Sequence, residues 1–423
     1  MISSNIIQVY EYSELKVDVD YGINKNIKFK EMHFQALAKY ATENYPCPYF
    51  NLFHKRIRFC NYVGVIKIGD ITIEVLPKCD RYDDDKQNWQ EVLLEMLAIS
   101  LKVDAKTTTD ADIHIRQHNV LETYLNIFLD ELVILLHQGL VKKYRTDESN
   151  QTSLKGKLQI HKNILKNIVH AERFYVSHQV YDRNNVYNSI IYQALCCIFS
   201  LNVTISLNKR CHSLLLDFPE CSPILISDNL FKRLQYDRKT ERYKKAINLA
   251  RIILMNYHPD IKGGSNNILA IMFDMNLLWE NYIYYVLKRA ESSLTVKAQR
   301  RMPFWQYEDK WKVNLIPDIV VTNNKEESIV LDTKWKYEKD VSMHDLRQMY
   351  AYGKYFNTLK SYLVYPDKIT DVDSIEIKEG AFYHPGNNGI DKRNLCGLLY
   401  VDLLKNNKLN KEIGKQILTK LGI

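Results

Sequence analysis

No two of the eight cysteines in this 423-residue chain form a C-x-x-C pair. The paired spacing of the common zinc clusters is therefore missing, and a disulfide framework is not expected at this length. No apolar run approaches the roughly 18 residues that span a bilayer. The opening stretch, MISSNIIQVYEYSELK, lacks the basic and apolar parts of a signal peptide. We therefore expect a protein of the reducing cytoplasm with no membrane partner.

The chain also lacks a phosphate-binding loop of the G-x-x-x-x-G-K-[ST] type. The glycines of IKGGSNN are not followed by lysine and serine or threonine, so this stretch is better interpreted as a linker. The chain is not expected to hydrolyse nucleotides by itself. Its excess of positive charge is mild, +8 at neutral pH, which permits an anionic partner such as DNA or RNA without requiring one.

The composition is that of a globular protein, with 46% apolar and 26% charged residues. The length predicts two or three domains. We predict an α/β multidomain protein with a β-rich N-terminal region over residues 1–110, a helical middle over 111–262 and an α/β region over 263–423. The linker at Pro259–Asn267 precedes the last of these. In the first region, Asn61–Lys78 has two β-branched runs around a Gly-Asp turn, which predicts a hairpin.

In the last region, the apolar spacing predicts alternating helices and strands around a small sheet. The expected elements are a long helix over Ile268–Ala290, strands near Val313–Val321, Ser328–Trp335 and Ser361–Tyr365, and a helix from Met343 to Phe356.

Three charged residues stand among the apolar residues of the first two of these strands. Asp318 precedes one run, and Asp332 and Lys334 close the next. Residues two apart in a strand share a face, so Asp332 and Lys334 point the same way, and the turn at Asn323–Glu327 brings Asp318 alongside. Paired carboxylates repel unless an oxygen-seeking cation such as Mg²⁺ lies between them. This set suits phosphodiester hydrolysis, although a solvated ion pair on a surface strand gives the same pattern.

Two nearby patterns strengthen the functional interpretation. Glu280, in LLWENYI, stands at the edge of an apolar helix face, from which it could reach a metal ion. Gln348 and Tyr352 are four apart and share one helix face, where they could brace the site or contact DNA. The alternatives are a solvated glutamate and ordinary packing.

Together, Glu280, Pro317-Asp318, Asp332-Thr333-Lys334 and Gln348/Tyr352 resemble the PD-(D/E)xK nuclease superfamily, in the variant with a Q-x-x-x-Y helix. From about residue 60 to 365, the chain resembles the McrC family, the nuclease subunits of McrBC modification-dependent restriction systems. The segments that carry this likeness are YVGVIKIGDITIEVLPK, LKGKLQI, YDRNNVYNSIIYQAL and DMNLLWENYI.

The resemblance implies a restriction-endonuclease-like C-terminal domain that cuts double-stranded DNA with Mg²⁺. By carry-over, Asp318, Asp332 and Glu280 would be metal ligands, and Lys334 would serve the attacking water. Such subunits dock on a hexameric McrB-like AAA+ GTPase and stimulate it. That partner recognises modified cytosine and translocates the DNA, so GTP would enter only through it. The basic residues Lys297, Arg300, Arg301, Lys336 and Arg347 are candidates for contacts with DNA phosphates, and solvated surface charges are the alternative.

Docking is predicted in the N-terminal region, with the hairpin near Gly64–Lys78 as candidate; the alternative is that this hairpin only covers its own core. Two other functions stay open. One is a non-catalytic activator of a ring NTPase, which the intact Asp318, Asp332 and Lys334 argue against. The other is a stand-alone nuclease, which the large regions before residue 263 argue against.

Overall fold

A computed structural model describes residues 5–21, 27–77, 86–100, 120–201, 203–258, 267–308, 311–336, 341–366, 375–383, 389–405 and 408–422. The predicted linker at Pro259–Asn267 lies outside these ranges except for its last residue. The chain divides into two compact units. The first comprises Met1–Asn5, Ile66–Thr72 and Leu121–Ile271; the second comprises Ile6–Val65, Ile73–Val120 and Met272–Ile423.

The first unit has a helical body, as the apolar spacing predicts. Asn185 caps one of its helices, α6, by accepting a hydrogen bond from the backbone N–H of Asn188. Ile190, Ile191 and Ala194 of that helix are buried. The helices are α4 (Val120–His137), α6 (Val186–Ser200), α7 (Ile205–Asp217), α8 (Asp228–Arg233) and α9 (Lys244–Met255).

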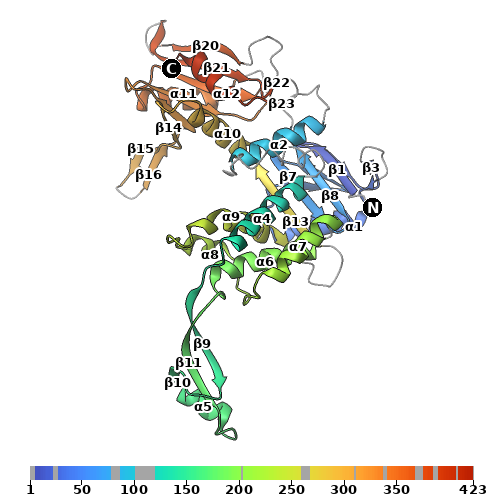
Figure 1. Ribbon diagram of the computed structural model, residues 1–423. Coiled ribbons are helices and arrows are strands. Elements are labelled where there is room, and N and C mark those ends of the chain that lie inside the picture. The colour runs from blue at the N-terminus through green and yellow to red at the C-terminus, as the bar shows by residue number, and fades with distance from the viewer. Residues whose placement is uncertain are drawn as a thin grey trace. The chain divides into compact units, whose positions relative to one another are not determined.

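A long arm leaves this helical body (Figure 1). Its two strands, β9 (Lys143–Gln151) and β11 (Phe174–Asp182), pair antiparallel over their whole length. At its end lie β10 (Lys157–Leu158) and the helix α5 (Ile160–Asn167). The expectation of a mainly helical middle region is therefore incomplete. KYRTDESNQ has no alternation of apolar and polar residues, and every side chain of β9 is exposed or half-buried.

The predicted N-terminal hairpin is confirmed: β7 (Tyr62–Ile68) and β8 (Ile71–Leu76) flank a turn at Gly69 and Asp70. Both strands are buried almost throughout. They belong to a sheet of order β1-β8-β7-β13-β12. Its other members are β1 (Asn5–Tyr10), β12 (Tyr257–His258) and β13 (Ile268–Asp274). The N-terminal region also contains the helix α1 (Glu31–Glu43) and two small sheets, one formed by β2 (Glu14–Lys16), β5 (Phe50–Phe53) and β6 (Arg56–Phe59) and the other by β3 (Asp20–Tyr21) and β4 (Ile27–Lys28).

The second unit contains a six-stranded mixed sheet of order β14-β17-β18-β19-β21-β20. One apolar core, which includes Trp279 and Leu331, packs on helices α2, α10 and α12, and another, which includes Val330 and Tyr352, packs on α11. The strands are β14 (Thr295–Ala298), β17 (Ile319–Thr322), β18 (Ser328–Thr333), β19 (Lys360–Pro366), β20 (Ile375–Tyr383) and β21 (Ile390–Val401), and the helices are α2 (Lys86–Ser100), α10 (Met275–Ala290), α11 (Met343–Tyr355) and α12 (Ile413–Leu421).

Two predictions for this unit need correction. The expected long helix from Ile268 is a strand, β13, followed by a helix, α10, because Asp274 caps the helix through the backbone N–H groups of Asn276 and Leu277. The expected strand near Val313–Val321 is interrupted at Ile316–Asp318. Its first part, β16 (Trp311–Leu315), instead pairs with β15 (Met302–Tyr307) in a separate hairpin, and a further short pair is formed by β22 (Leu404–Lys405) and β23 (Lys408–Leu409).

Candidate active site

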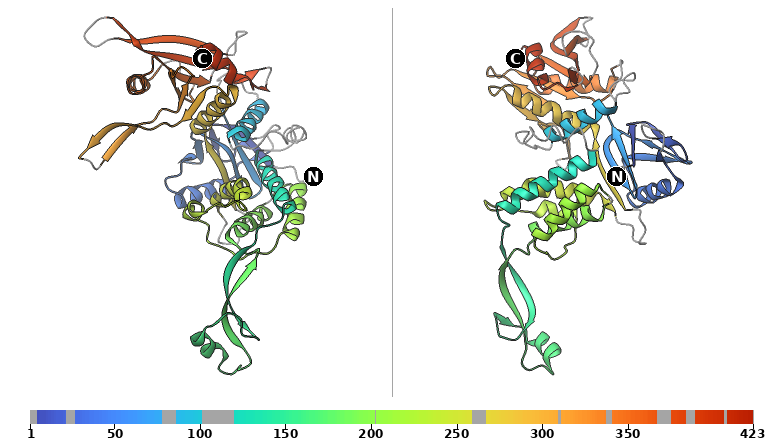
Figure 2. Two further views of the ribbon diagram at one scale, coloured as in Figure 1. Left: turned by 60° about the vertical axis from the view of Figure 1, so that its left-hand side comes forward. Right: turned by 45° about the vertical axis from the view of Figure 1, so that its right-hand side comes forward.

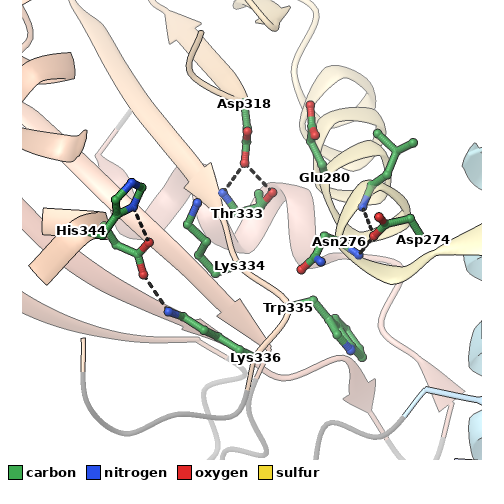
Figure 3. A pocket seen from close by; sticks show the side chains of 11 residues that line it. Asp274, Asn276, Glu280, Asp318, Thr333, Lys334, Trp335, Lys336 and His344 are labelled. Carbon is green, nitrogen blue, oxygen red and sulfur yellow. Dashed lines mark hydrogen bonds and ion pairs between the residues drawn. The ribbon is translucent and has the colours of Figure 1, made fainter. Parts of the chain in front are cut away.

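The site is built where strands β17 and β18 end side by side. Their antiparallel register pairs Ile319 with Leu331, which places Asp318 beside Asp332, as the sequence predicts. Asp318 does not point to solvent. Its Oδ2 accepts hydrogen bonds from the backbone N–H of Thr333 over 2.7 Å and from Thr333 Oγ1 over 2.8 Å. Both bonds end on the same carboxylate oxygen of Asp318 (Figure 3).

Asp332 is fully buried, and Lys334 is its charged neighbour on the same face of the strand. Lys334 Nζ lies 2.6 Å from Asp332 Oδ2, whereas Leu331 packs in the opposite core. Burial and the nearby charge of Asp318 raise the pKa of Asp332. Burial lowers the pKa of Lys334, but the charge and hydrogen bond of Asp332 outweigh it and the net pKa is raised. Lys334 is thus an ammonium at neutral pH.

Glu280 faces this pair from helix α10. Gln299 Nε2 donates a hydrogen bond to Glu280 Oε1 over 3.0 Å. Burial and the charge of Asp318 raise the pKa of Glu280 to about 7, although the bond from Gln299 opposes this shift. Glu280, Asp318, Thr333 and Lys334 line one open pocket of about 500 Å³ (Figure 3). The excess of negative charge here favours a positively charged occupant.

We tested whether this pocket fits the Mg²⁺ that the resemblance implies. Within the described ranges, no three His, Cys, Asp or Glu side chains are close enough to form a ready-made metal cage. Mg²⁺ does not need one, because it keeps several waters and binds through one or two carboxylates. The buried Oδ1 of Asp332 accepts no hydrogen bond there, an expensive arrangement unless a ligand completes it. The donor set therefore fits Mg²⁺.

Gln348 and Tyr352 lie beneath the site on α11. Gln348 Nε2 donates to Tyr352 Oη over 2.6 Å, and Tyr352 Oη donates to the carbonyl of Ile316 over 2.9 Å. Tyr352 is buried in the core on that side of the sheet. The pair thus fixes the backbone at Ile316, two residues before Asp318. This agrees with a role in bracing the site.

The candidate phosphate contacts differ in their surroundings. Lys297, Arg300, Arg301 and Arg347 are exposed, and the Arg300 guanidinium lies 5.5 Å from the ring centre of Phe356. Lys336 is different, because its Nζ lies 2.7 Å from Asp345 Oδ2. Much of its charge is therefore already balanced by a carboxylate.

Three contributors to the site were not predicted. Thr333 holds Asp318, and Asp345 holds Lys336. Trp335 packs edge-on against Trp279 with ring centres 5.6 Å apart, and its Nε1 donates to Glu11 Oε1 over 2.7 Å. The apolar pattern of this stretch marks Trp335 as a core residue, but no local pattern points to a partner 324 positions earlier.

Fold and pocket together define a mixed α/β chain of more than one compact unit with an acidic pocket at the ends of two strands. The sequence profile of the McrBC 5-methylcytosine restriction system component matches residues 57–366. The chain belongs to this family. No curated protein matches it. No helix in the described parts of the chain is long and apolar enough to cross a membrane.

Solved structures resemble the chain as well. One is a chain of the half-complex from a tetradecameric assembly of Thermococcus gammatolerans McrB AAA+ hexamers with bound McrC. It is 18% identical, with a TM-score of 0.66, and the match covers 99% of this chain and 100% of the other. A second, from the cryo-EM structure of the Thermococcus gammatolerans McrBC complex, is 20% identical, with a TM-score of 0.49, over 68% of this chain and 88% of the other.

Proposed function

We propose that this chain is the Mg²⁺-dependent DNA endonuclease subunit of an McrBC-like, type IV restriction system for defence against foreign DNA. Its PD-(D/E)xK-like nuclease domain lies in the region after residue 263. The observation that carries the proposal is the convergence of Asp318, Lys334 and Glu280 on one open pocket where β17 begins and β18 ends. Asp332 is buried directly against this set, with its Oδ2 2.6 Å from Lys334 Nζ.

The residues have separate tasks in this proposal. Asp318 and Asp332 hold Mg²⁺, with Glu280 as a further ligand. The ion supplies stabilisation of the negative charge that develops on the scissile phosphate. Lys334 acts through its charge: as an ammonium it donates hydrogen bonds that orient the attacking water or a phosphate oxygen, and it accepts no proton at neutral pH. Thr333 keeps Asp318 in one orientation.

Docking on an McrB-like AAA+ GTPase hexamer is the second part of the proposal. The first unit offers a surface for it, because the apolar side chains on and after α5, at the end of the arm, are exposed by 58–83%: Ile160, Ile164, Leu165, Ile168 and Val169. Exposed apolar clusters are typical of interaction sites. The hairpin near Gly64–Lys78 is a poorer candidate, since its described strands are buried. The structurally similar chain from the Thermococcus gammatolerans assembly of McrB AAA+ hexamers with bound McrC supports the choice of this partner.

The test is DNA cleavage by the chain co-purified with its ring-NTPase partner. Methylated and unmethylated duplex DNA are incubated with Mg²⁺ and GTP, with wild type beside Asp332→Ala, and GTP hydrolysis is read in the same tubes. We expect wild type to cut and Asp332→Ala to lose cutting while it still stimulates the GTPase. Stimulation by wild type without cutting of any DNA would instead make the chain a non-catalytic activator.

A further inference from the structure

A second element beside the pocket has features that hydrolysis does not explain. Strands β15 and β16 form their own two-stranded sheet and leave the six-stranded sheet as a projecting hairpin (Figure 2). The hairpin begins directly after Arg300 and Arg301. It returns at Leu315, three residues before Asp318.

The hairpin carries large aromatic side chains that are exposed to solvent. Phe304, Trp305 and Tyr307 are exposed by 44%, 48% and 54%. The rings of Trp305 and Tyr307 are stacked, with centres 6.0 Å apart and planes at 17°. Both residues lie on the face of the ribbon that Val313 shares through its pairing with Trp305, while Gln306 and Lys312 pair on the opposite face. Trp305 and Tyr307 therefore share one face of the ribbon, and Gln306 and Lys312 share the other.

The charges around this hairpin are mostly positive. Arg300, Arg301 and Lys312 are exposed at its base and along its second strand, whereas Glu308 is the acidic residue in its described part. A surface of flat apolar rings flanked by cations is complementary to nucleic acid, which offers phosphates outside and bases inside its grooves. A two-stranded ribbon also has the width that the major groove of duplex DNA admits.

The base of the hairpin is fixed to the helix that supports the site. The Phe304 ring meets the Tyr355 ring edge-on at 5.1 Å, and Arg300 lies over Phe356, both at the end of α11. On the returning side, Tyr352 of the same helix holds the carbonyl of Ile316. A ligand bound to the hairpin is therefore held at a fixed position relative to Asp318.

We propose that the β15–β16 hairpin is a DNA-binding ribbon that lies in a groove of the duplex next to the scissile phosphate. Trp305 and Tyr307 contact the bases and sugars, and Arg300, Arg301 and Lys312 contact the phosphates. The inference rests on the proposed nuclease function. A second copy of this chain fits the surface less well, because a symmetric contact would bring the same cations together.

The test uses the full-length chain with a fluorescein-labelled DNA duplex, in EDTA so that no cutting occurs, followed by fluorescence anisotropy. Trp305→Ala with Tyr307→Ala should weaken duplex binding about tenfold or more, because two large apolar contacts leave the interface. Lys312→Gln should reduce the slope of log affinity against log salt by about 0.9. Phe199→Ala is the matched control, because Phe199 is exposed by 48%, as Trp305 is, but lies on α6. It should leave duplex binding unchanged.

Three outcomes would overturn the inference: no duplex binding by wild type at low salt, unchanged binding by the aromatic variant, or a loss restricted to single-stranded DNA. A change only in self-association, measured by sedimentation, would assign the hairpin to a second copy instead. If the aromatic variant fails to fold, Lys312→Glu replaces it in the same binding assay and should also weaken duplex binding. Asp332→Ala separates the two proposals, since it should bind duplex normally and fail to cut. If it cuts, the nuclease assignment fails whatever the hairpin does.

Discussion

Glu280, Asp318 and Lys334 line one pocket, and the buried Asp332 lies against Lys334. The mutual effects of these charges lower the stability of the protein when no cation is bound. Burial and the charge of Asp318 raise the pKa of Glu280 to about 7, and the same two causes raise the pKa of Asp332. Such carboxyl groups favour the protonated state in the folded protein. A divalent cation between them would remove that preference, because it stabilises the ionised forms.

This arrangement predicts the dependence of stability on pH. Without a divalent cation, Glu280 should make the free energy of unfolding fall as the pH rises from 4.5 to about 7. In that window the folded state binds more protons than the unfolded state. Mg²⁺ should raise the melting temperature most above pH 7 and least near pH 4.5. Thermal unfolding of wild type and Glu280→Gln, with EDTA or Mg²⁺, measures both effects.

The comparison with Glu280→Gln removes the titration of Glu280 together with its effect on the neighbouring charges. The variant should be the more stable of the two in EDTA above pH 7, and the difference should vanish at low pH. A wild type that gains stability relative to Glu280→Gln as the pH rises would contradict the assigned direction of the pKa shift.

At the scale of elements, helix α11 supports the approach to Asp318 through a single hydroxyl. Tyr352→Phe removes the hydrogen bond to the Ile316 carbonyl and leaves that carbonyl without its donor. We expect a loss of about 1 kcal/mol in stability, which corresponds to a melting temperature roughly 2–4 °C lower, together with slower cleavage. Tyr355→Phe, an exposed tyrosine of the same helix, is the control. Equal effects of both changes on melting would rule out the bracing role.

Most elements that pack on a core could be predicted from the sequence, whereas the strands of the exposed arm could not. The strands β17 and β18 follow from their apolar runs and the turn at Asn323–Glu327. The arm strand β9 could not be predicted, because its sequence has no alternation of apolar and polar residues. The strand β13 was taken for the start of a helix because a short apolar run fits both structures.

The same distinction holds for the site. Asp318, Asp332 and Lys334 could be placed from their positions in the strand pattern, since strand periodicity fixes the faces. Their supports could not be predicted. Thr333 contributes a backbone N–H that every residue type except proline possesses. The partner of Trp335 lies in the N-terminal strand region, at Glu11.

At the scale of the whole molecule, cutting and partner activation are proposed to reside in different units. Ile164→Asp with Leu165→Asp adds charge to exposed positions of α5, so the fold should be unaffected. Stimulation of the partner GTPase should fall at least tenfold. Asp332→Ala, by contrast, should keep this stimulation and lose DNA cleavage. Leu216→Asp, on α7 and also exposed, should stimulate normally in the same GTP hydrolysis assay. Full stimulation by the α5 variant would place docking elsewhere.

The second unit is assembled from three separate stretches of chain, Ile6–Val65, Ile73–Val120 and Met272–Ile423. A ribosome releases the stretch with Glu11 first and the stretch with Asp318, Asp332 and Trp335 last, after the whole arm-bearing unit has emerged. The hydrogen bond between Trp335 and Glu11 consequently forms only after the arm-bearing unit has been synthesised. Excision of the C-terminal stretch alone would separate Trp335 from its hydrogen-bond acceptor at Glu11, so we expect that stretch to be less stable when it is expressed without the N-terminal strands.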